Sequence, residues 1–321
     1  MSSTQVSVPG TARRIPSAGP VPGRLRSRGA RGRRQNLLFA LPAALFLLVF
    51  SLIPLFQLLR MSVSAVTSQT LNSGAWDFVG AGNLVASATQ GSLVPAFVNT
   101  VIFVLIVTAI GLVGGLAAAI LVSTSTPLSA FLLGLMVFIW ALPPVVNGSV
   151  WKFLLGDAGL INAIVTGLGI SHHAVPFLYD DRFALASVAI VNSWAVVPFN
   201  ALVFRAAILG IPGETFEAAR LDGANRWQEI WHMIVPAVRP TTLVLAILTI
   251  VYAFRSFDFI YVMTYGGPGV ATNTLPFLSY LQAFVRFDFG MGAATAVLCV
   301  ALVLVLAVVY ARSVRSEEAK G

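Results

Sequence analysis

Long apolar segments with few or no charged residues recur along the chain. A helix needs about 20 predominantly apolar residues to cross the hydrocarbon core of a bilayer. Six segments meet this requirement, at residues 37–60, 97–123, 129–151, 184–209, 240–263 and 291–312. The pattern therefore predicts an all-α membrane protein with about six transmembrane helices.

Two features interrupt this pattern. Pro143 and Pro144 stand together in the third segment, where they are expected to kink or break the helix. The uncharged stretch Phe259–Val285 has the length of a seventh span, but its centre at Thr264–Gly269 reads TYGGPG, which is typical of a loop. We interpret it as an external loop with some amphipathic structure. Residues 152–183 are predicted to form another external segment, with a short interfacial helix at Gly159–Ile170.

Composition supports a membrane protein. The chain is 57% hydrophobic and 10% charged, whereas a soluble domain carries about a quarter charged residues. The net charge of +8 could suggest nucleic-acid binding. However, no aromatic residue is interleaved with the basic residues that precede the first apolar segment, so the sequence offers no platform on which bases could stack. We therefore expect no nucleic-acid partner.

The basic residues predict how the chain is oriented. Eight of the twenty Lys and Arg residues precede the first apolar segment, and with six spans seven more fall on the same side. These are Arg13, Arg14, Arg24, Arg26, Arg28, Arg31, Arg33, Arg34, Arg205, Arg220, Arg226, Arg239, Arg312, Arg315 and Lys320. Because cytoplasmic segments carry an excess of basic residues, both termini are predicted to be cytoplasmic.

The N-terminal region could also be the start of a cleaved signal peptide. The run from Gln35 to Leu59 is uncharged, however, which is longer than the usual apolar core of about 7–15 residues in such peptides. We predict three parts: a disordered basic tail at residues 1–34 that meets membrane lipid, one transmembrane domain at 35–313, and a cytoplasmic tail at 314–321.

The segment Ile211–Pro236, on the predicted cytoplasmic side, has the pattern of two short helices joined by a turn. Glu214 and Glu217 suit the first turns of a helix, where the macrodipole is positive. Gly223 permits a sharp turn. The second helix is predicted at about Asn225–Ile234 and closed by Pro236, with a stripe formed by Trp227, Ile230, Trp231 and Ile234. Such a pair suits docking into another subunit, or lying on the membrane surface with its tryptophans as anchors.

This segment resembles the EAA loop of ABC-importer permeases. That loop reads Glu-Ala-Ala, three residues, Gly, nine residues, Ile-x-Leu-Pro. Here Glu217-Ala218-Ala219, Gly223 and Met233-Ile234-Val235-Pro236 stand at the same spacing, with Met233 and Val235 as conservative departures. By this resemblance, the residues that couple to the ATPase would be Glu217, Ala218, Ala219, Leu221, Asp222, Gly223 and Pro236.

Other segments resemble the maltose and glycerol-3-phosphate class of sugar permeases. They are Leu221–Ala224, Phe78–Gly80, Gly159–Asn162, Tyr265–Gly269 and Phe287–Gly290. One departure is Tyr265, which replaces a usual Gly. The resemblance covers residues 37 to 312.

The resemblance implies the type I permease fold of ABC importers, in the cell membrane of a prokaryote. The chain would be the first-type permease of a heterodimeric pair that imports a sugar or sugar-like solute. The implied partners are a second homologous permease, two nucleotide-binding ATPase subunits and an extracytoplasmic solute-binding protein. ATP and Mg would be bound by the ATPase subunits, and this chain would need no cofactor.

Polar and aromatic residues inside the fourth and fifth segments are candidates for a substrate path. Asn192, Val196 and Phe199 share one helical face, as do Thr249, Ala253 and Ser256, with Tyr252 and Phe257 adjacent. These residues offer the hydrogen bonds and aromatic faces that a sugar requires. The alternative is that they hold helices together, which is a common role of polar residues in spans. The candidates are Asn192, Phe199, Thr249, Tyr252 and Ser256.

Other side chains suggest no chemistry. Arg255 and Asp258 are expected to pair with each other, and His172, His173 and His232 lack ligand-spaced neighbours, so no metal site is predicted. The chain has no phosphate-binding loop and no catalytic constellation. Two other functions remain to be compared: an ion-coupled transporter, which predicts carboxylates deep in the spans and an inverted repeat, and a membrane scaffold without a polar path.

Overall fold

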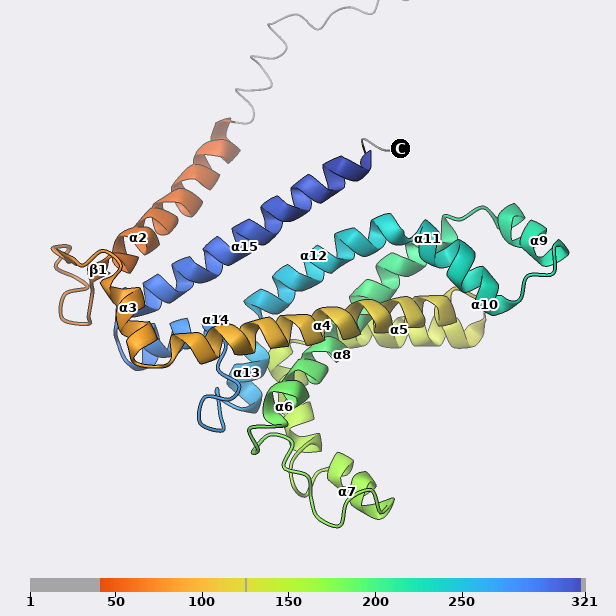
Figure 1. The fold of residues 1–321 in the computed structure, drawn as a ribbon, viewed down its shortest axis with the longest axis horizontal. Coiled ribbons are helices and arrows are strands. Elements are labelled where there is room, and N and C mark those ends of the chain that lie inside the picture. The colour runs from red at the N-terminus through yellow and green to blue at the C-terminus, as the bar shows by residue number, and fades with distance from the viewer. Residues whose placement is uncertain (1–40, 125, 319–321) are drawn as a thin grey trace, which may run out of the picture. The chain divides into compact units, whose positions relative to one another are not determined.

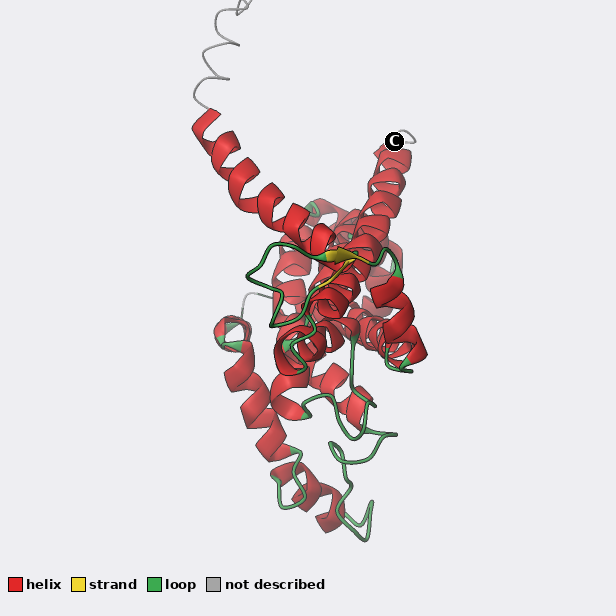
Figure 2. Ribbon diagram, turned by 90° about the vertical axis from the view of Figure 1, so that its left-hand side faces the viewer, coloured by secondary structure: helices red, strands yellow, loops and turns green. Residues whose placement is uncertain are grey.

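The computed structural model describes residues 41–124 and 126–318. It divides the chain into two units, Met1–Pro54 and Leu55–Gly321, and the predicted basic tail at 1–34 lies outside the described residues. Helices dominate both described parts (Figure 2). The described strands are β1, Ser64–Ala65, and β2, Asp77–Phe78, which pair antiparallel. The predicted all-α fold is confirmed.

Four helices are long and apolar enough to cross a membrane without a break. They are the helix Leu41–Ser62, which includes η1 at Leu48–Leu52 and α2 at Ile53–Ser62; α4, Leu93–Val122; α8, Ala184–Leu209; and α15, Phe289–Glu318 (Figure 1). Each of them overlaps one of the predicted apolar segments. Hydrophobic length alone therefore located these four helices.

The other two predicted segments are broken helices. The third divides into α5, Pro127–Ala141, and α6, Pro144–Leu154, which meet at 103°. This confirms the expected break at Pro143 and Pro144. The fifth divides into α12, Arg239–Arg255, and α13, Asp258–Met263. The two bent pairs that each count as one candidate span are Pro127–Ala141 with Pro144–Leu154 and Arg226–Ala237 with Arg239–Arg255. With them the described residues provide up to six spans, which agrees with the prediction of about six.

The break in the fifth segment corrects one prediction. Where the structure describes side chains, Arg255 and Asp258 form no ion pair, so the expected pair between them is wrong. The reason is local: α12 ends at Arg255, and Ser256 is extended, with ψ of 114°. The two charged residues are therefore not one helical turn apart.

Short helices form most of the remaining structure. They are α3, Gly82–Thr89; α7, Leu160–Gly167; α9, Gly213–Leu221; α10, Arg226–Glu229; η2, Ile230–Ile234; α11, Val235–Ala237; α14, Leu275–Tyr280; and η3, Leu281–Val285. The prediction of a short helix at Gly159–Ile170 is confirmed by α7. The stretch Phe259–Val285 forms α13, a loop, α14 and η3 rather than a seventh span, as expected.

Close packing of α4 against α8 lies at the centre of the second unit. A Cβ atom at Gly115 would stand 2.6 Å from Cβ of Asn200 and 3.3 Å from the backbone nitrogen of Ala201. At Gly111 it would stand 3.3 Å from Nδ2 of Asn200. Small residues at such positions let the backbones of two membrane helices approach closely.

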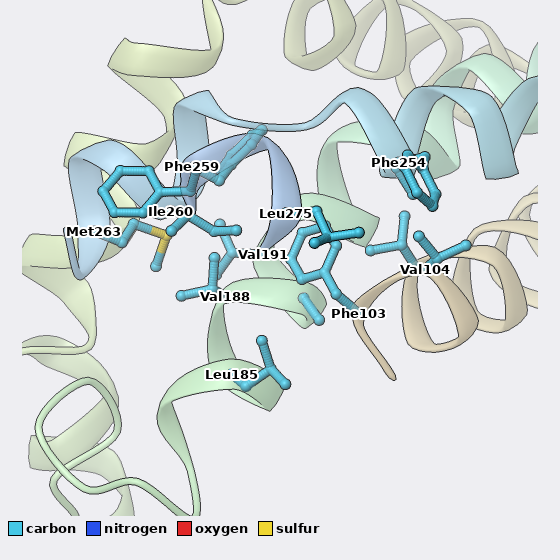
Figure 3. Close-up of a cluster of buried hydrophobic side chains, with 14 of the residues drawn as sticks. Phe103, Val104, Leu185, Val188, Val191, Phe254, Phe259, Ile260, Met263 and Leu275 are labelled. Atoms are coloured by element: carbon cyan, nitrogen blue, oxygen red, sulfur yellow. The ribbon is translucent and has the colours of Figure 1, made fainter. Parts of the chain in front are cut away.

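Two apolar clusters flank this contact. The larger takes Phe103 and Val104 from α4, Val188 from α8 and Ile260 from α13 (Figure 3). The smaller lies toward the C-terminal ends of α4 and α8, and joins Ala119, Phe204 and Ile208 to Ile234, Val238 and Leu245. The smaller cluster packs the short helices α9–α11 against the long helices.

We predict that Gly115→Ala destabilises the protein. The added methyl group has no room against Asn200, and overpacking of this kind costs about 1–3 kcal/mol. Gly134→Ala on α5 is the matched control, since a Cβ atom added at Gly134 would meet no atom within 4 Å. Thermal unfolding of the detergent-solubilised protein measures both, and equal midpoints would contradict the packing described here.

Candidate functional site

A cleft of about 280 Å³ opens beside α8 and α12. It is lined by Trp140, Ala195, Val196, Phe199, Asn200, Leu248, Thr249 and Tyr252. Three of the five substrate-path candidates, Phe199, Thr249 and Tyr252, are therefore brought together in one hollow. The ring of Phe199 stacks on Trp140 of α5, with centroids 5.8 Å apart. The cleft thus combines aromatic rings and aliphatic side chains with one polar pair, Asn200 and Thr249.

The polar pair in the cleft is Asn200 with Thr249. Nδ2 of Asn200 donates to Oγ1 of Thr249 over 3.1 Å, and both residues are buried. Asn200 was missed from the sequence, although it stands eight residues after Asn192 and therefore on the same helical face. An amide in an otherwise apolar span was the signal that could have identified it.

The other two candidates are placed differently. Nδ2 of Asn192 donates to Oγ of Ser256 over 2.7 Å. Asn192 is fully buried, and neither residue lines the cleft. The Oδ1 atom of Asn192 receives no hydrogen bond from any described residue. A buried acceptor without a donor costs about 1–3 kcal/mol, so this atom has a hydrogen bond to gain from any donor that reaches it.

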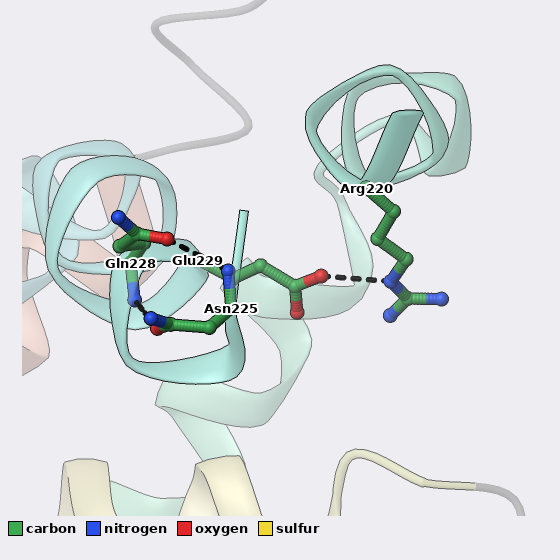
Figure 4. A network of polar contacts seen from close by, with 4 residues as sticks. All are labelled: Arg220, Asn225, Gln228 and Glu229. Atoms are coloured by element: carbon green, nitrogen blue, oxygen red, sulfur yellow. Dashed lines mark hydrogen bonds and ion pairs between the residues drawn. The ribbon is translucent and has the colours of Figure 1, made fainter. Parts of the chain in front are cut away.

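The second candidate site is the α9–α11 hairpin, which comprises α9, a turn at residues 222–225, α10, η2 and α11. Gly223 has φ of +85°, which supports the predicted turn, because left-handed backbone favours glycine. Asn225 then caps α10: its Oδ1 accepts from the backbone N–H of Gln228 at 3.0 Å, and Oε1 of Gln228 accepts from the N–H of Asn225 at 2.7 Å (Figure 4). This reciprocal capping box fixes the start of the second limb.

An ion pair joins the two limbs of the hairpin. Nε of Arg220 on α9 donates to Oε1 of Glu229 on α10 over 2.7 Å (Figure 4). The Glu229 side chain is 11% exposed and that of Arg220 is 65% exposed. The hydrogen bond and the negative charge of Glu229 both raise the pKa of the Arg220 guanidinium. Helical spacing in the sequence could not reveal this pair, because its members lie on different helices.

The four apolar residues of the predicted stripe on the second limb differ in burial. Ile234 is buried in the smaller cluster, and Ile230 packs against it. Trp227 and Trp231 are 70% and 60% exposed. Helical spacing places the four residues on one side of the limb. The long helices that pack against this side contact the two isoleucines and leave the two tryptophans exposed.

The outer face of the hairpin also carries predicted coupling residues. Glu217 and Asp222 are exposed, and Leu221 is 89% exposed. Pro236 lies inside the last helical turn, and the chain bends by 67° into α12 just after it. The hairpin therefore exposes acidic, apolar and aromatic side chains.

The comparisons with known proteins decide the family. Residues 110–317 match the binding-protein-dependent transport system inner membrane component. The chain belongs to this family. It is a multi-pass membrane permease of an ABC importer, and a non-catalytic transport subunit.

Curated relatives of this permease align over most of their length. It is 30% identical to the osmoprotective compounds uptake permease protein GgtC of Synechocystis sp. over 291 residues, which cover 88% of this chain and 99% of the relative. It is 32% identical to the sn-glycerol-3-phosphate transport system permease protein UgpA of Yersinia enterocolitica, over 86% and 92%. It is 28% identical to the trehalose/maltose transport system permease protein MalF of Thermococcus litoralis, over 87% and 93%.

A solved structure shares the fold of the permease. A chain of a bacterial ABC transporter involved in the import of the acidic polysaccharide alginate superposes with a TM-score of 0.75 at 19% identity, covering 88% of this chain and 96% of that chain. The predicted permease fold is confirmed by this match.

We predict that Arg220→Gln loosens the hairpin. The substitution leaves the nearly buried Glu229 carboxylate without its cation, and the two limbs lose their direct link. Amide hydrogens of residues 213–237 should then exchange faster, as measured by mass spectrometry, and the charge swap R220E/E229R should restore part of the protection. Arg226→Gln is the control, since Arg226 has no ion-pair partner in the described ranges. Equal exchange in the two single variants would show that the pair does not brace the hairpin.

Proposed function

We propose that this permease forms half of the pathway by which a sugar or sugar-like solute enters the cell. The cleft carries the proposal: aromatic rings from Trp140, Phe199 and Tyr252 surround the hydrogen-bonding pair Asn200–Thr249. This combination suits a ring with apolar C–H faces and hydroxyl groups. Relatives named for glycerol phosphate, for trehalose and maltose, and for osmoprotective compounds support the same class of solute.

The remaining components would be separate subunits. In this proposal a second permease completes the pathway, two ATPase subunits bind ATP and Mg, and an extracytoplasmic protein delivers the solute. The match to a binding-protein-dependent family supports the delivery step. Both chain termini would lie in the cytoplasm, on the side of the α9–α11 hairpin, as the basic residues predict.

The hairpin would couple the permease to an ATPase subunit. Its exposed face offers Glu217 to a basic partner group, and Leu221, Trp227 and Trp231 as apolar contacts. Buried aromatic anchors often dominate the binding energy of protein interfaces. The turn at Gly223, the capping box at Asn225 and the ion pair at Glu229 would let this face move as one body, so that a displacement reaches α12 directly.

Asn192 and Ser256 would take part only when the pathway opens. They bind each other across α8 and α12 in this conformation, so a separation of the two helices would release both groups to the solute. The Oδ1 atom of Asn192, which no described residue satisfies, would accept a hydroxyl hydrogen bond. This assigns the cleft residues and the buried pair to successive stages of transport.

The proposal is tested with the complete importer reconstituted in vesicles. ATP hydrolysis and uptake of radiolabelled trehalose, maltose and glycerol 3-phosphate are measured with and without the solute-binding protein. We expect one of the solutes, or a related one, to stimulate both activities only when the binding protein is present. Solute uptake by this chain alone without ATP would contradict the proposal, and binding of the ATPase without any solute flux would indicate a scaffold.

We predict that Gly223→Val uncouples transport. Valine at positive φ strains the backbone by about 1–2 kcal/mol, although its Cβ would meet no atom within 4 Å. The turn should therefore change shape and tilt α10, so that the ATPase copurifies poorly and uptake is lost at normal membrane levels. Gly213→Val is the matched control, because Gly213 lies at the start of α9 without positive φ or close neighbours. Retention of both activities in Gly223→Val would refute the coupling role.

We predict that Tyr252→Leu weakens solute handling by the cleft. The loss of one aromatic face is worth about 0.5–1.5 kcal/mol, which corresponds to a roughly two- to tenfold rise in the KM for uptake. Asn192→Ala should instead lower the maximal rate, because Asn192 becomes accessible only on opening. The uptake kinetics of both variants, at matched membrane levels, separate the two effects. An unchanged KM in Tyr252→Leu would remove the cleft from the substrate path.

A further inference from the structure

The short helix α13 has two chemically different faces. Phe259, Ile260 and Met263 are almost completely buried in the larger apolar cluster. Phe257 packs against the edge of this cluster, Tyr261 lies one helical turn further along, and Tyr265 follows after the helix ends. Tyr261 is 40% exposed and Tyr265 is 50% exposed. The core therefore accounts for Phe259, Ile260 and Met263, and it leaves the exposed rings of Tyr261 and Tyr265 unexplained.

The exposed rings belong to one connected group. We define the outer aromatic cluster as Phe257, Tyr261, Tyr265, Phe277 and Tyr280. Ring centroids are 5.3 Å apart for Phe257 and Tyr261, 5.4 Å for Tyr261 and Tyr265, and 5.7 Å for Tyr261 and Tyr280. Phe277 is fully buried beneath them. The cluster thus has a buried base at Phe277 and an accessible surface at Tyr261 and Tyr265.

The phenol groups of the three tyrosines are close enough to influence one another. Desolvation raises the pKa of Tyr280, and the neighbouring Tyr261 and Tyr265 raise it further. Each phenol can donate one hydrogen bond and also accept. The cluster therefore combines stacked ring faces with a group of hydroxyls, which is the chemistry of the cleft repeated at a second place.

The backbone at Tyr265 is held in a conformation that a tyrosine rarely adopts. Its φ is +54°, which costs an L-residue roughly 1–2 kcal/mol relative to glycine. Half of its side chain is exposed, so burial does little to offset this cost. Strain that packing does not explain is a reason to look for a function.

The neighbouring residues keep the loop in place. A Cβ at Gly266 would lie 2.7 Å from Cε1 of Phe277, so the chain passes directly over the base of the cluster. Nδ2 of Asn99 on α4 donates to the carbonyl oxygens of Val270 and Asn273, each at 3.0 Å. Tyr265 is therefore presented by an anchored loop.

The cluster continues the aromatic lining of the cleft along the chain. Tyr252 lines the cleft on α12, Phe257 follows just after the break at Ser256, and Tyr261 and Tyr265 follow at four-residue intervals. The sequence from α12 through α13 thus carries aromatic rings from the cleft to the predicted external loop. Tyr265, beyond the end of α13, is the last of them along the chain.

We propose that the outer aromatic cluster is a subsite that receives the pyranose ring of a carbohydrate before it reaches the cleft. The apolar C–H face of the sugar would lie on the exposed rings of Tyr261 and Tyr265, and its hydroxyls would bond the phenols. The proposal rests on the proposed function, because it assumes that a carbohydrate passes this way. It adds a second binding position to the cleft, at the outer end of α13.

The test is binding of maltose to the complete importer in nanodiscs, followed by saturation-transfer NMR. Sorbitol, an acyclic polyol without a ring face, is the comparison solute. The variant Y261L/Y265L should weaken the maltose signal by about five- to tenfold, as expected for loss of stacked rings, and leave the weak sorbitol signal unchanged. Y261F/Y265F keeps the rings and should retain most of the maltose binding.

A second variant separates binding from folding. Tyr265→Gly removes both the ring and the backbone strain, so thermal stability should stay equal or rise while maltose binding falls. Loss of stability together with binding would mean that Tyr265 only supports the fold. Failure of Y261L/Y265L to copurify with the other subunits would make the cluster a subunit interface. Either result overturns the subsite.

The same measurement distinguishes the two proposals. If Tyr252→Leu weakens maltose binding and Y261L/Y265L does not, the subsite is wrong and the cleft remains the solute site. If maltose gives no signal above sorbitol with the wild-type importer, the subsite fails for pyranoses. Uptake of a carbohydrate in the vesicle assay would then still support the proposed function, and its absence would remove both.

Discussion

The close approach of α4 to α8 at Gly115 is the constraint on which the rest of the permease depends. Because Gly115 lacks a Cβ, Asn200 can lie directly against α4. From there its amide reaches Thr249 on α12, and three long helices meet at one point. The cleft opens beside this contact, and the two apolar clusters pack on either side of it. In a bilayer the lipid is as apolar as the helices, so the hydrophobic effect does not drive helices together. Close packing and hydrogen bonds must stabilise their association instead.

The polar groups inside the spans follow the same reasoning. Asn200 and Asn192 each bind a hydroxyl on or just beyond α12, so these bonds tie α8 to α12 in the apolar interior. Such bonds are modest in strength, since polar groups in membranes also find partners in other states. Modest bonds suit helices that, in the proposed function, would separate and close again during transport. Oδ1 of Asn192 receives no hydrogen bond from any described residue, so the observed packing leaves one buried acceptor on α8 unused.

The α9–α11 hairpin differs from the spans, because in the proposed function it would transmit movement outside the membrane. Ile234 packs it against α4 and α8, and the ion pair of Arg220 with Glu229 holds its limbs together. The tryptophans and Glu217 remain exposed on its other side. A segment that is held in place on one side and exposes apolar and acidic side chains on the other is suited to binding a partner. The outer aromatic cluster shows the same division, with Phe277 buried and Tyr265 exposed.

The sequence by itself determined the features that depend on local chemistry. Hydrophobic length located the spans, Pro143 and Pro144 marked the break between α5 and α6, and Gly223 marked the turn of the hairpin. Only the tertiary structure decided which polar groups meet. Asn192 and Ser256 are 64 residues apart and Asn200 and Thr249 are 49 apart, and their pairing depends on how α8 and α12 are rotated against each other. The break at Ser256, which separates Arg255 from Asp258, was not predicted. On the second hairpin limb, packing against the long helices buries Ile234 and leaves Trp227 and Trp231 exposed. Spacing along one helix specifies a direction, but only packing determines what lies in that direction.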